Sequence, residues 1–384
     1  MAQKKVGILT SGHFDAAGSD RLVFGGAERY GFQLTTFLRE EGFDVEWWQP
    51  GDGWTREYLP GVPIHGLPVN QVPYQTLPAL NQAFEENAMN VDYAIYFVSF
   101  LAYPQALEKS ISISHGIYWD LPQYDDLLGN REAREEWRRR MYIAFSNVRK
   151  VVSVDTNTIH WANATFPGLR YKFTYLPNFA DLALFHPDDT RRASFASEAG
   201  ALPKEDPVRI LFPRRLTSVR GVNEAAWTAV QLTRRYPNVE VDFVGRAHDD
   251  RIEAALDSWA GGHERIHYTW FPPQQMPGAY QHADIVVIPT KAAEGTSLSC
   301  IEAMASGCAV VATWVGGLSD LIIDGFNGRQ IAPSREALFT ALCELVEDPM
   351  QRRLLGQRAE QTAQAFSLER WKDRWRRVIR EVFT

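Results

Sequence analysis

Short strand-like runs alternate along the chain with longer stretches that carry apolar side chains at helical spacing. The strand-like runs cover residues 6–9, 43–47, 94–97, 111–114, 151–154, 208–212, 239–245, 265–268, 284–288 and 308–313. Helical periodicity is found at residues 27–41, 131–147, 222–236, 298–305 and 334–347. Apolar runs of this length are typical of parallel strands that helices cover on both faces. The alternation therefore predicts an α/β protein.

The alternation of strands and helices starts twice, on either side of a polar segment at residues 187–207 that contains Pro, Asp and Ser. A chain of 384 residues is also longer than one ordinary core requires. We therefore predict two domains with a boundary near residue 187. Within the first, residues 50–90 contain six well-spaced prolines and are predicted to be irregular.

The composition is that of a soluble globular enzyme and narrows the set of partners. Apolar residues make up 45% of the chain and charged residues 23%. A formal net charge of −7 argues against nucleic acid as the main partner. The 3 cysteines have neither metal-ligand nor disulfide spacing, which favours a reducing cytoplasm. Because no signal-peptide or transmembrane run is found, we expect a cytoplasmic protein.

Residues 289–307 carry the most informative polar side chains. Glu294 and Gly295 follow the apolar run 284–288, and a short helix begins near Leu298. Backbone N–H groups at such a helix start form an anion site. Glu302 falls on the apolar stripe of this helix, where a carboxylate is costly unless it is hydrogen-bonded. Glu302 alone could simply reach solvent from the edge of the stripe, but two glutamates around a glycine loop favour polyol recognition.

Two arginines lie in a second loop, between the run 208–212 and the helix 222–236. Arg215 and Arg220 are five positions apart and can converge on one diphosphate, because guanidinium N–H groups match phosphate oxygens. The alternative is a pair of solvated surface arginines, which would be preferred for these residues in isolation.

These motifs resemble the group 1 family of retaining glycosyltransferases that use nucleotide sugars. The Glu294–Glu302 spacing resembles the Glu-x7-Glu signature of that family. Residues 213–221 resemble its Gly-Arg-Leu-x-x-x-Lys-Gly segment, with Arg214 in place of Gly and Arg220 in place of Lys. Thr296 stands where the family carries an aromatic residue. The resemblance covers essentially the whole chain and is weakest over residues 50–90.

The resemblance implies the GT-B fold, in which two Rossmann-like domains face each other across a cleft. The C-terminal domain, residues 188–366, would hold the nucleotide sugar. The N-terminal domain, residues 1–187 plus 367–384, would hold the acceptor, because the terminal helix of the family returns to it. In this chain, the predicted C-terminal helix is basic on one face. This face could make a peripheral contact with anionic lipid at the inner membrane face, although a solvated face is favoured.

The resemblance also implies roles for single residues. The catalytic candidates are His115, which follows a predicted strand, and Arg215, Arg220 and Glu294. The donor-binding candidates share positions at strand ends and helix starts: Gly25, Gly26, Gly245, Trp270, Phe271, Gly295, Thr296, Ser297, Leu298 and Glu302. Gly245 ends a predicted strand as if to leave room for a ligand. Directly after His115, Tyr118, Trp119 and Asp120 could face the acceptor.

We therefore expect a retaining glycosyltransferase that moves a hexose from a UDP- or GDP-sugar to a hydroxyl acceptor, such as a glycan, a glycolipid or a small molecule. No Asp-x-Asp motif follows a strand, so we expect no metal and no cofactor besides the nucleotide-sugar substrate. Two alternatives stay open: a nucleotide-sugar 2-epimerase, which would change the donor without an acceptor, and a catalytically silent sugar-nucleotide binder. The sequence identifies neither the sugar, the base, the acceptor nor the oligomeric state.

Overall fold

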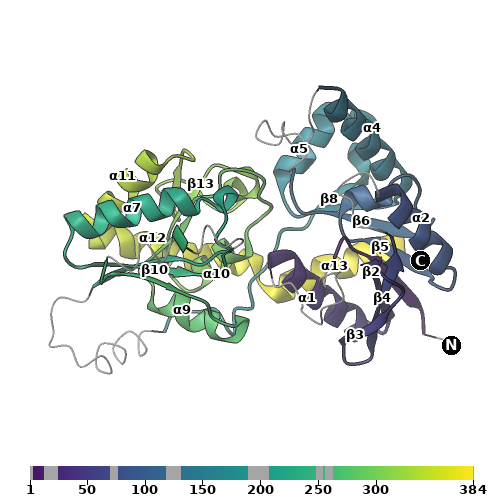
Figure 1. Cartoon of the computed structure of the whole chain (residues 1–384), viewed down its shortest axis with the longest axis horizontal. Helices are drawn as coiled ribbons and strands as arrows, with labels where there is room; N and C mark the ends of the chain where they lie inside the picture. Colours follow the sequence, from purple (N-terminus) through teal and green to yellow (C-terminus); the bar gives the residue numbers. More distant parts are fainter. Residues whose placement is uncertain are drawn as a thin grey trace. The chain divides into compact units, whose positions relative to one another are not determined.

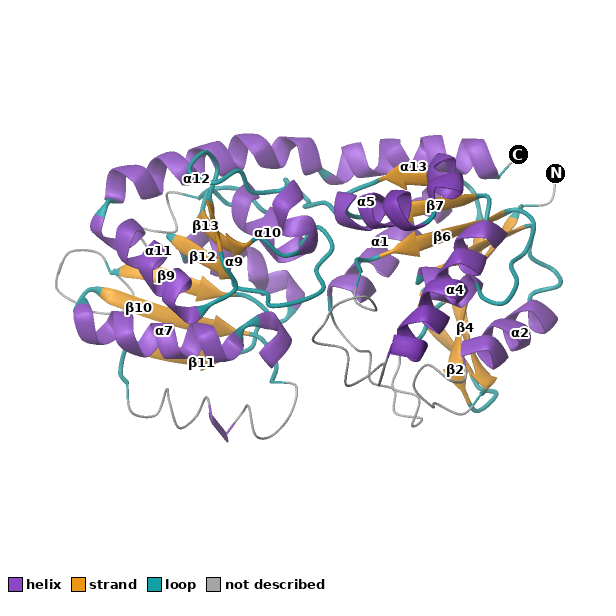
Figure 2. Cartoon of the chain, turned by 90° about the horizontal axis from the view of Figure 1, so that it is seen from above, coloured by secondary structure: helices purple, strands orange, loops and turns teal. Residues whose placement is uncertain are grey.

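The computed structural model describes residues 3–12, 25–69, 77–117, 131–188, 207–247, 254–255 and 263–383. They separate into two compact units, Met1–Pro177 with Lys372–Thr384, and Asn178–Trp371 (Figure 1). Each unit contains a largely parallel sheet with helices on both faces (Figure 2). The α/β prediction is confirmed.

The first unit is built on a sheet in the order β3-β4-β2-β1-β5-β6-β7-β8. Its described strands run parallel to their neighbours, except that β3 is antiparallel to β4. The strands are β1 (Lys5–Leu9), β2 (Asp44–Gly51), β3 (Thr55–Leu59), β4 (Val62–Pro68), β5 (Tyr93–Tyr96), β6 (Ser110–Ser114), β7 (Lys150–Ser153) and β8 (Phe173–Tyr175). The helices are α1 (Gly26–Glu40), α2 (Leu77–Asn87), α4 (Arg131–Asn147) and α5 (Thr156–Thr165).

The prediction that residues 50–90 are irregular is wrong for much of this stretch. Strands β3 and β4 form a hairpin, and Pro60 lies in the turn between them. Helix α2 begins at Leu77 and has Pro78 in its first turn, where the missing N–H removes no helical hydrogen bond. The prolines therefore mark the ends of regular elements, whereas the prediction took them as evidence against regular structure.

The C-terminal helix α13 (Leu368–Val382) belongs to the first unit over its greater part, as predicted. Trp375 Nε1 donates a hydrogen bond to the Tyr30 hydroxyl on α1 at 3.1 Å. Two basic side chains of α13 pair with acidic residues at the end of α1: Lys372 with Glu40 at 2.8 Å and Arg376 with Glu41 at 2.7 Å. The basic face is thus partly neutralised within the unit. Among the described residues, no helix is long and apolar enough to cross a membrane.

The second unit is built on a parallel sheet in the order β11-β10-β9-β12-β13-β14. The strands are β9 (Val208–Phe212), β10 (Val239–Val244), β11 (Ile266–Thr269), β12 (Ile285–Ile288), β13 (Ala309–Thr313) and β14 (Arg329–Ile331). Helices α7 (Val222–Arg235) and α11 (Arg335–Glu347) pack with Ile210 and Phe212 in one apolar cluster. On the other face, Leu211 packs with helices α9 (Met276–His282), α10 (Leu298–Ala305) and α12 (Pro349–Ala363). Successive residues of β9 therefore serve opposite faces, as the period of a strand requires.

The residues after Pro177 belong to the second unit because of specific contacts. The backbone N–H of Asn178 donates to Thr296 Oγ1 at 2.7 Å, and its side-chain amide donates to the Thr296 carbonyl. Ala180 and Ser367 pair as an isolated β-bridge. The division at residue 177 follows these contacts, whereas the boundary near residue 187 rests on composition.

Gly221 allows the loop before α7 to pack against the loop after β12. Its φ is +81°, and a Cβ there would lie 2.0 Å from the Pro289 carbonyl oxygen. Gly325 is a matched control, because its φ is +71° but its Cβ would meet nothing within 4 Å. We expect Gly325→Ala to lower the free energy of unfolding by about 1–2 kcal/mol. Gly221→Ala should lower it by at least about 2 kcal/mol more, because the clash adds to the backbone strain. Equal losses in urea unfolding would contradict this packing.

Candidate functional site

The candidate site lies in the second unit, at the carboxyl ends of the neighbouring strands β9 and β12. The chain order diverges at this pair, because β10 and β11 follow on one side and β13 and β14 on the other. Ligands of open α/β sheets bind at such a switch point. The arginine loop follows β9 and the glutamate loop follows β12, so both predicted motifs meet here.

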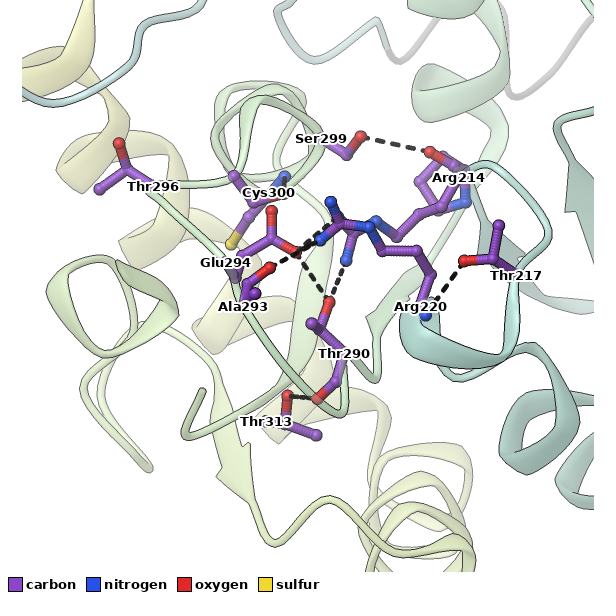
Figure 3. A network of polar contacts seen from close by, with 12 residues as sticks. Arg214, Thr217, Arg220, Thr290, Ala293, Glu294, Thr296, Ser299, Cys300 and Thr313 are labelled. Carbon is purple, nitrogen blue, oxygen red and sulfur yellow. Dashed lines mark hydrogen bonds and ion pairs between the residues drawn. The ribbon is translucent and has the colours of Figure 1, made fainter. Parts of the chain in front are cut away.

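Glu294 is the centre of the site, because three donors converge on one of its carboxylate oxygens (Figure 3). Oε2 accepts hydrogen bonds from Arg214 Nη2 at 2.7 Å, from Thr290 Oγ1 at 2.9 Å, and from Arg220 Nη1. The side chains of Glu294 and Arg214 are only 8% and 7% exposed, whereas Arg220 is 26% exposed. Oε1 accepts no hydrogen bond from any residue that the structure describes.

The charges around Glu294 keep it ionised and leave the cluster positive. Burial raises the pKa of Glu294, but the charges of Arg214 and Arg220 outweigh burial and hold the pKa below its ordinary value. One carboxylate thus faces two guanidinium groups, which stay protonated in proteins. A buried net positive charge is costly unless an anion compensates it. The exposed Arg215 adds a further positive charge to the same loop.

The backbone before Glu294 is strained. Ala293 has a φ of +45° and is the only non-glycine residue with positive φ in the described part of the chain. Such a conformation costs roughly 1–3 kcal/mol and persists only where the surroundings enforce it. The Ala293 carbonyl accepts a hydrogen bond from Arg220 Nη1 at 3.3 Å, so the arginine that pairs with Glu294 also binds this strained residue.

Glycines let neighbouring loops approach both members of the ion pair. The backbone N–H of Gly317 donates to the Glu294 carbonyl at 2.9 Å, and a Cβ on Gly316 would lie 2.1 Å from that oxygen. A Cβ on Gly245 would lie 1.9 Å from the Arg214 carbonyl oxygen. The sequence predicted that the space beside Gly245 would receive a ligand. In the structure, the backbone of Arg214 occupies this space.

Helix α10 joins the two loops and carries the second glutamate. Ser297 caps the helix by accepting from the Cys300 N–H at 3.4 Å, and Ser299 Oγ donates to the Pro213 carbonyl at 3.2 Å. Glu302 is buried, and Tyr280 of α9 donates its hydroxyl to Glu302 Oε2 at 3.0 Å. The expectation that a carboxylate on this stripe needs a hydrogen-bond donor is confirmed.

Two aromatic candidates follow β11. Trp270 is 43% exposed, and the Arg246 guanidinium lies 4.2 Å from the centre of its ring. Phe271 packs against the apolar cluster that contains α9 and α10. Trp270 therefore presents a ring to solvent, whereas Phe271 mainly supports the core.

The remaining candidates belong to the first unit. His115 follows β6, and its Nε2 lies 3.0 Å from the Phe97 carbonyl oxygen. Because a carbonyl only accepts, Nε2 carries the proton and the neutral ring keeps a lone pair on Nδ1. Gly25 precedes α1 and Gly26 begins it, without a side-chain cap. Tyr118, Trp119 and Asp120 lie outside the described residues.

Comparison with known proteins shows which family this chain is similar to. Residues 195–362 match the family model described as glycosyl transferases group 1. This part of the chain is similar to the group 1 glycosyltransferases. A D-inositol 3-phosphate glycosyltransferase of Nocardia farcinica is 33% identical over 211 residues, which cover 52% of this chain and 45% of that protein. The chain thus aligns with about half the length of that relative.

A longer alignment and two solved structures extend the similarity to the whole chain. The D-inositol 3-phosphate glycosyltransferase of an Arthrobacter strain is 26% identical over 382 residues, covering 90% of this chain and 87% of that protein. Sucrose-phosphate synthase from Thermosynechococcus elongatus superposes with a TM-score of 0.77 at 20% identity, covering 99% of both chains. Anabaena HepE in complex with UDP gives 0.74 at 16% identity, covering 99% of this chain and 100% of that one. The GT-B fold class is confirmed.

The candidate site includes two residues that the sequence analysis missed, Arg214 and Thr290. The structure brings Arg220 and Glu294 together, but Arg215 is exposed and makes no side-chain hydrogen bond with a described residue. The sequence did contain a usable signal for Arg214, because a buried carboxylate in a loop requires a nearby buried cation. Within the described residues, no three His, Cys, Asp or Glu side chains gather as a metal site would require.

The surroundings of His115 predict an unprotonated ring at neutral pH. Burial lowers the pKa of His115 to about 4, although the hydrogen bond to Phe97 opposes this. An unfolded histidine titrates near pH 6.5, so between about pH 6.5 and 4 the unfolded state binds the proton first and acidification destabilises the fold. Imidazole ¹⁵N chemical shifts should show a neutral ring protonated at Nε2 at pH 5.5. The His115→Gln variant, which lacks these signals, assigns them to His115. A doubly protonated ring at pH 6 would contradict the described environment.

Proposed function

We propose that the protein transfers a hexose from a nucleoside-diphosphate sugar to a hydroxyl acceptor with retention of anomeric configuration. The observation that carries this proposal is the Arg214–Glu294–Arg220 cluster at the switch point. It combines excess positive charge, suited to a diphosphate, with a carboxylate oxygen, Oε1, that accepts no hydrogen bond from a described residue. A nucleotide sugar requires both features within a few ångströms of each other.

Arg220 and Arg215 would stabilise the departing diphosphate. Both are more exposed than Arg214, so an incoming anion could reach them. Preorganised positive charge is the largest available contribution when negative charge develops on a leaving group. We propose that these arginines, assisted by the backbone N–H groups at the start of α10, perform this role without a catalytic metal. The resemblance implies front-face substitution assisted by the leaving group.

The two glutamates would bind different parts of the donor. Glu294 would accept hydrogen bonds from hydroxyls of the transferred sugar, and Glu302 from the ribose hydroxyls of the nucleotide. His115 would serve the sugar through its Nδ1 lone pair. HepE was solved with UDP-glucose, which makes UDP-sugars the first donors to test, and the names of the relatives make D-inositol 3-phosphate the first acceptor.

The proposed function is tested first by donor binding and then by transfer. A thermal-shift panel of UDP-, GDP- and ADP-sugars in EDTA should show one class that raises the melting temperature, because a ligand of the folded state stabilises it. The stabilising donor is then incubated with D-inositol 3-phosphate and with glycan acceptors, and the product linkage is read by NMR. Turnover in EDTA with a retained anomer is expected.

Three results would count against the proposal. Restoration of lost turnover by Mg²⁺ or Mn²⁺ would contradict metal independence. Conversion of the donor to an epimer without any acceptor would favour the epimerase alternative. If no nucleotide sugar raised the melting temperature, the proposed donor site would be contradicted.

Substitutions of Glu294 and of Glu302 should have different effects on binding and turnover. Glu302→Gln should weaken UDP binding and raise the donor KM, because the ribose contact is the same in the ground and transition states. Glu294→Gln should lower kcat by roughly 10- to 1,000-fold and leave UDP affinity nearly unchanged, because UDP lacks the sugar. Calorimetry with UDP beside steady-state kinetics measures both, with the exposed Glu336→Gln on α11 as the control. The opposite pattern would show that the two roles are reversed.

A further inference from the structure

We propose that Arg214 is a positioning residue that holds Glu294 by Oε2 and so leaves Oε1 as the single oxygen offered to the donor sugar. The inference rests on the proposed function and assigns a task to a residue that lies in the place of the family's glycine. Arg214 itself would touch neither the sugar nor the diphosphate.

The hydrogen bonds of Arg214 and Thr290 form a closed ring that includes one oxygen, Glu294 Oε2. Its Nη2 donates directly to Glu294 Oε2 at 2.7 Å, and its Nη1 donates to Thr290 Oγ1. The Thr290 hydroxyl then donates to the same Oε2 at 2.9 Å. Both ends of the guanidinium therefore bind Glu294, one directly and one through a hydroxyl (Figure 3). A planar fork of donors holds a carboxylate in a fixed direction.

The partners of this ring are themselves fixed. Thr290 is fully buried, and its carbonyl accepts from Thr313 Oγ1 at 2.6 Å at the end of β13. The Arg214 backbone packs against Gly245 at the end of β10. The Arg214 backbone and its hydrogen-bond partner Thr290 are thus each held by a neighbouring strand end.

Burial distinguishes the two arginines that bind Glu294. The Arg214 side chain is 7% exposed, whereas Arg220 is 26% exposed and can reach an incoming anion. If Arg220 turns to the diphosphate, Arg214 remains to keep Glu294 ionised and oriented. The excess of one positive charge in the cluster is explained by this division, since one arginine serves the carboxylate and one serves the donor.

A positioning role predicts a specific kinetic pattern for Arg214→Gln. The kcat with the donor sugar should fall by roughly 10- to 100-fold, because Glu294 is no longer held in its productive direction. The Kd for UDP should stay within about 3-fold, because UDP lacks the sugar that Glu294 binds. The acid limb of the kcat–pH profile should move to higher pH, since loss of the Arg214 charge raises the pKa of Glu294 and the carboxyl protonates earlier as pH falls.

Three further variants make the experiment decisive. Arg214→Lys keeps the charge, so its kcat should lie between those of Arg214→Gln and the wild type. Its acid limb should lie close to that of the wild type. Thr290→Val removes the hydroxyl that joins Arg214 Nη1 to Oε2 but leaves the direct bond from Arg214 Nη2. It should show a smaller loss with the same pattern, and it also serves if Arg214→Gln does not fold. Arg209→Gln is the matched control, because Arg209 lies on β9, the strand that precedes the loop of Arg214, and pairs with Glu240 at 3.3 Å. It should leave kcat, UDP affinity and the acid limb unchanged.

The outcomes separate this inference from the proposed function. If the wild-type protein transfers sugar and Arg214→Gln loses UDP affinity as strongly as kcat, Arg214 is a diphosphate ligand and the inference is overturned. Wild-type kcat and pH dependence in Arg214→Gln overturn it as well. If the wild type binds no nucleotide sugar, the proposed function fails. A double-mutant cycle of Arg214→Gln and Glu294→Gln in unfolding then still tests the pair, and the absence of coupling overturns the inference.

Discussion

The convergence of three donors on Glu294 Oε2 is the interaction on which the second unit is organised. It joins the loop after β9, which supplies Arg214 and Arg220, to the loop after β12, which supplies Thr290 and Glu294. Glycines at 221, 245 and 316 permit the close backbone approaches that bring these loops together. The positive φ of Ala293 shows that the local backbone adapts to this arrangement rather than determining it.

Stability alone does not account for such a cluster. A buried ion pair often contributes no more than well-packed apolar residues of the same volume, because removing the charges from water is costly. Here two arginines face one carboxylate, so the buried charge is not balanced within the cluster. The arrangement becomes favourable when an anion supplies the missing negative charge. The feature that costs folding free energy, the excess positive charge, is thus one that a nucleotide-sugar donor would use.

The fold and part of the site could be predicted from the sequence, because both follow from local patterns. Buried parallel strands produce continuous apolar runs, and the loops that follow them are where ligands bind, which places Glu294 and Arg220 near each other without coordinates. The sequence did not show which of two adjacent arginines turns inward. Arg214 rather than Arg215 does so, in a loop whose backbone packs against Gly245, and this contact spans distant positions. The pairing of Tyr280 with Glu302 and of His115 with the Phe97 carbonyl depends in the same way on tertiary packing.

A crystal structure of the protein with an unhydrolysed UDP-sugar would show directly what Glu294 binds. A sugar hydroxyl is expected within hydrogen-bond distance of Glu294 Oε1, while Oε2 keeps its bonds to Arg214 and Thr290 and Arg220 contacts the diphosphate. A structure in which the Arg214 guanidinium binds phosphate oxygens, or in which Glu294 has turned away from the sugar, would contradict this expectation.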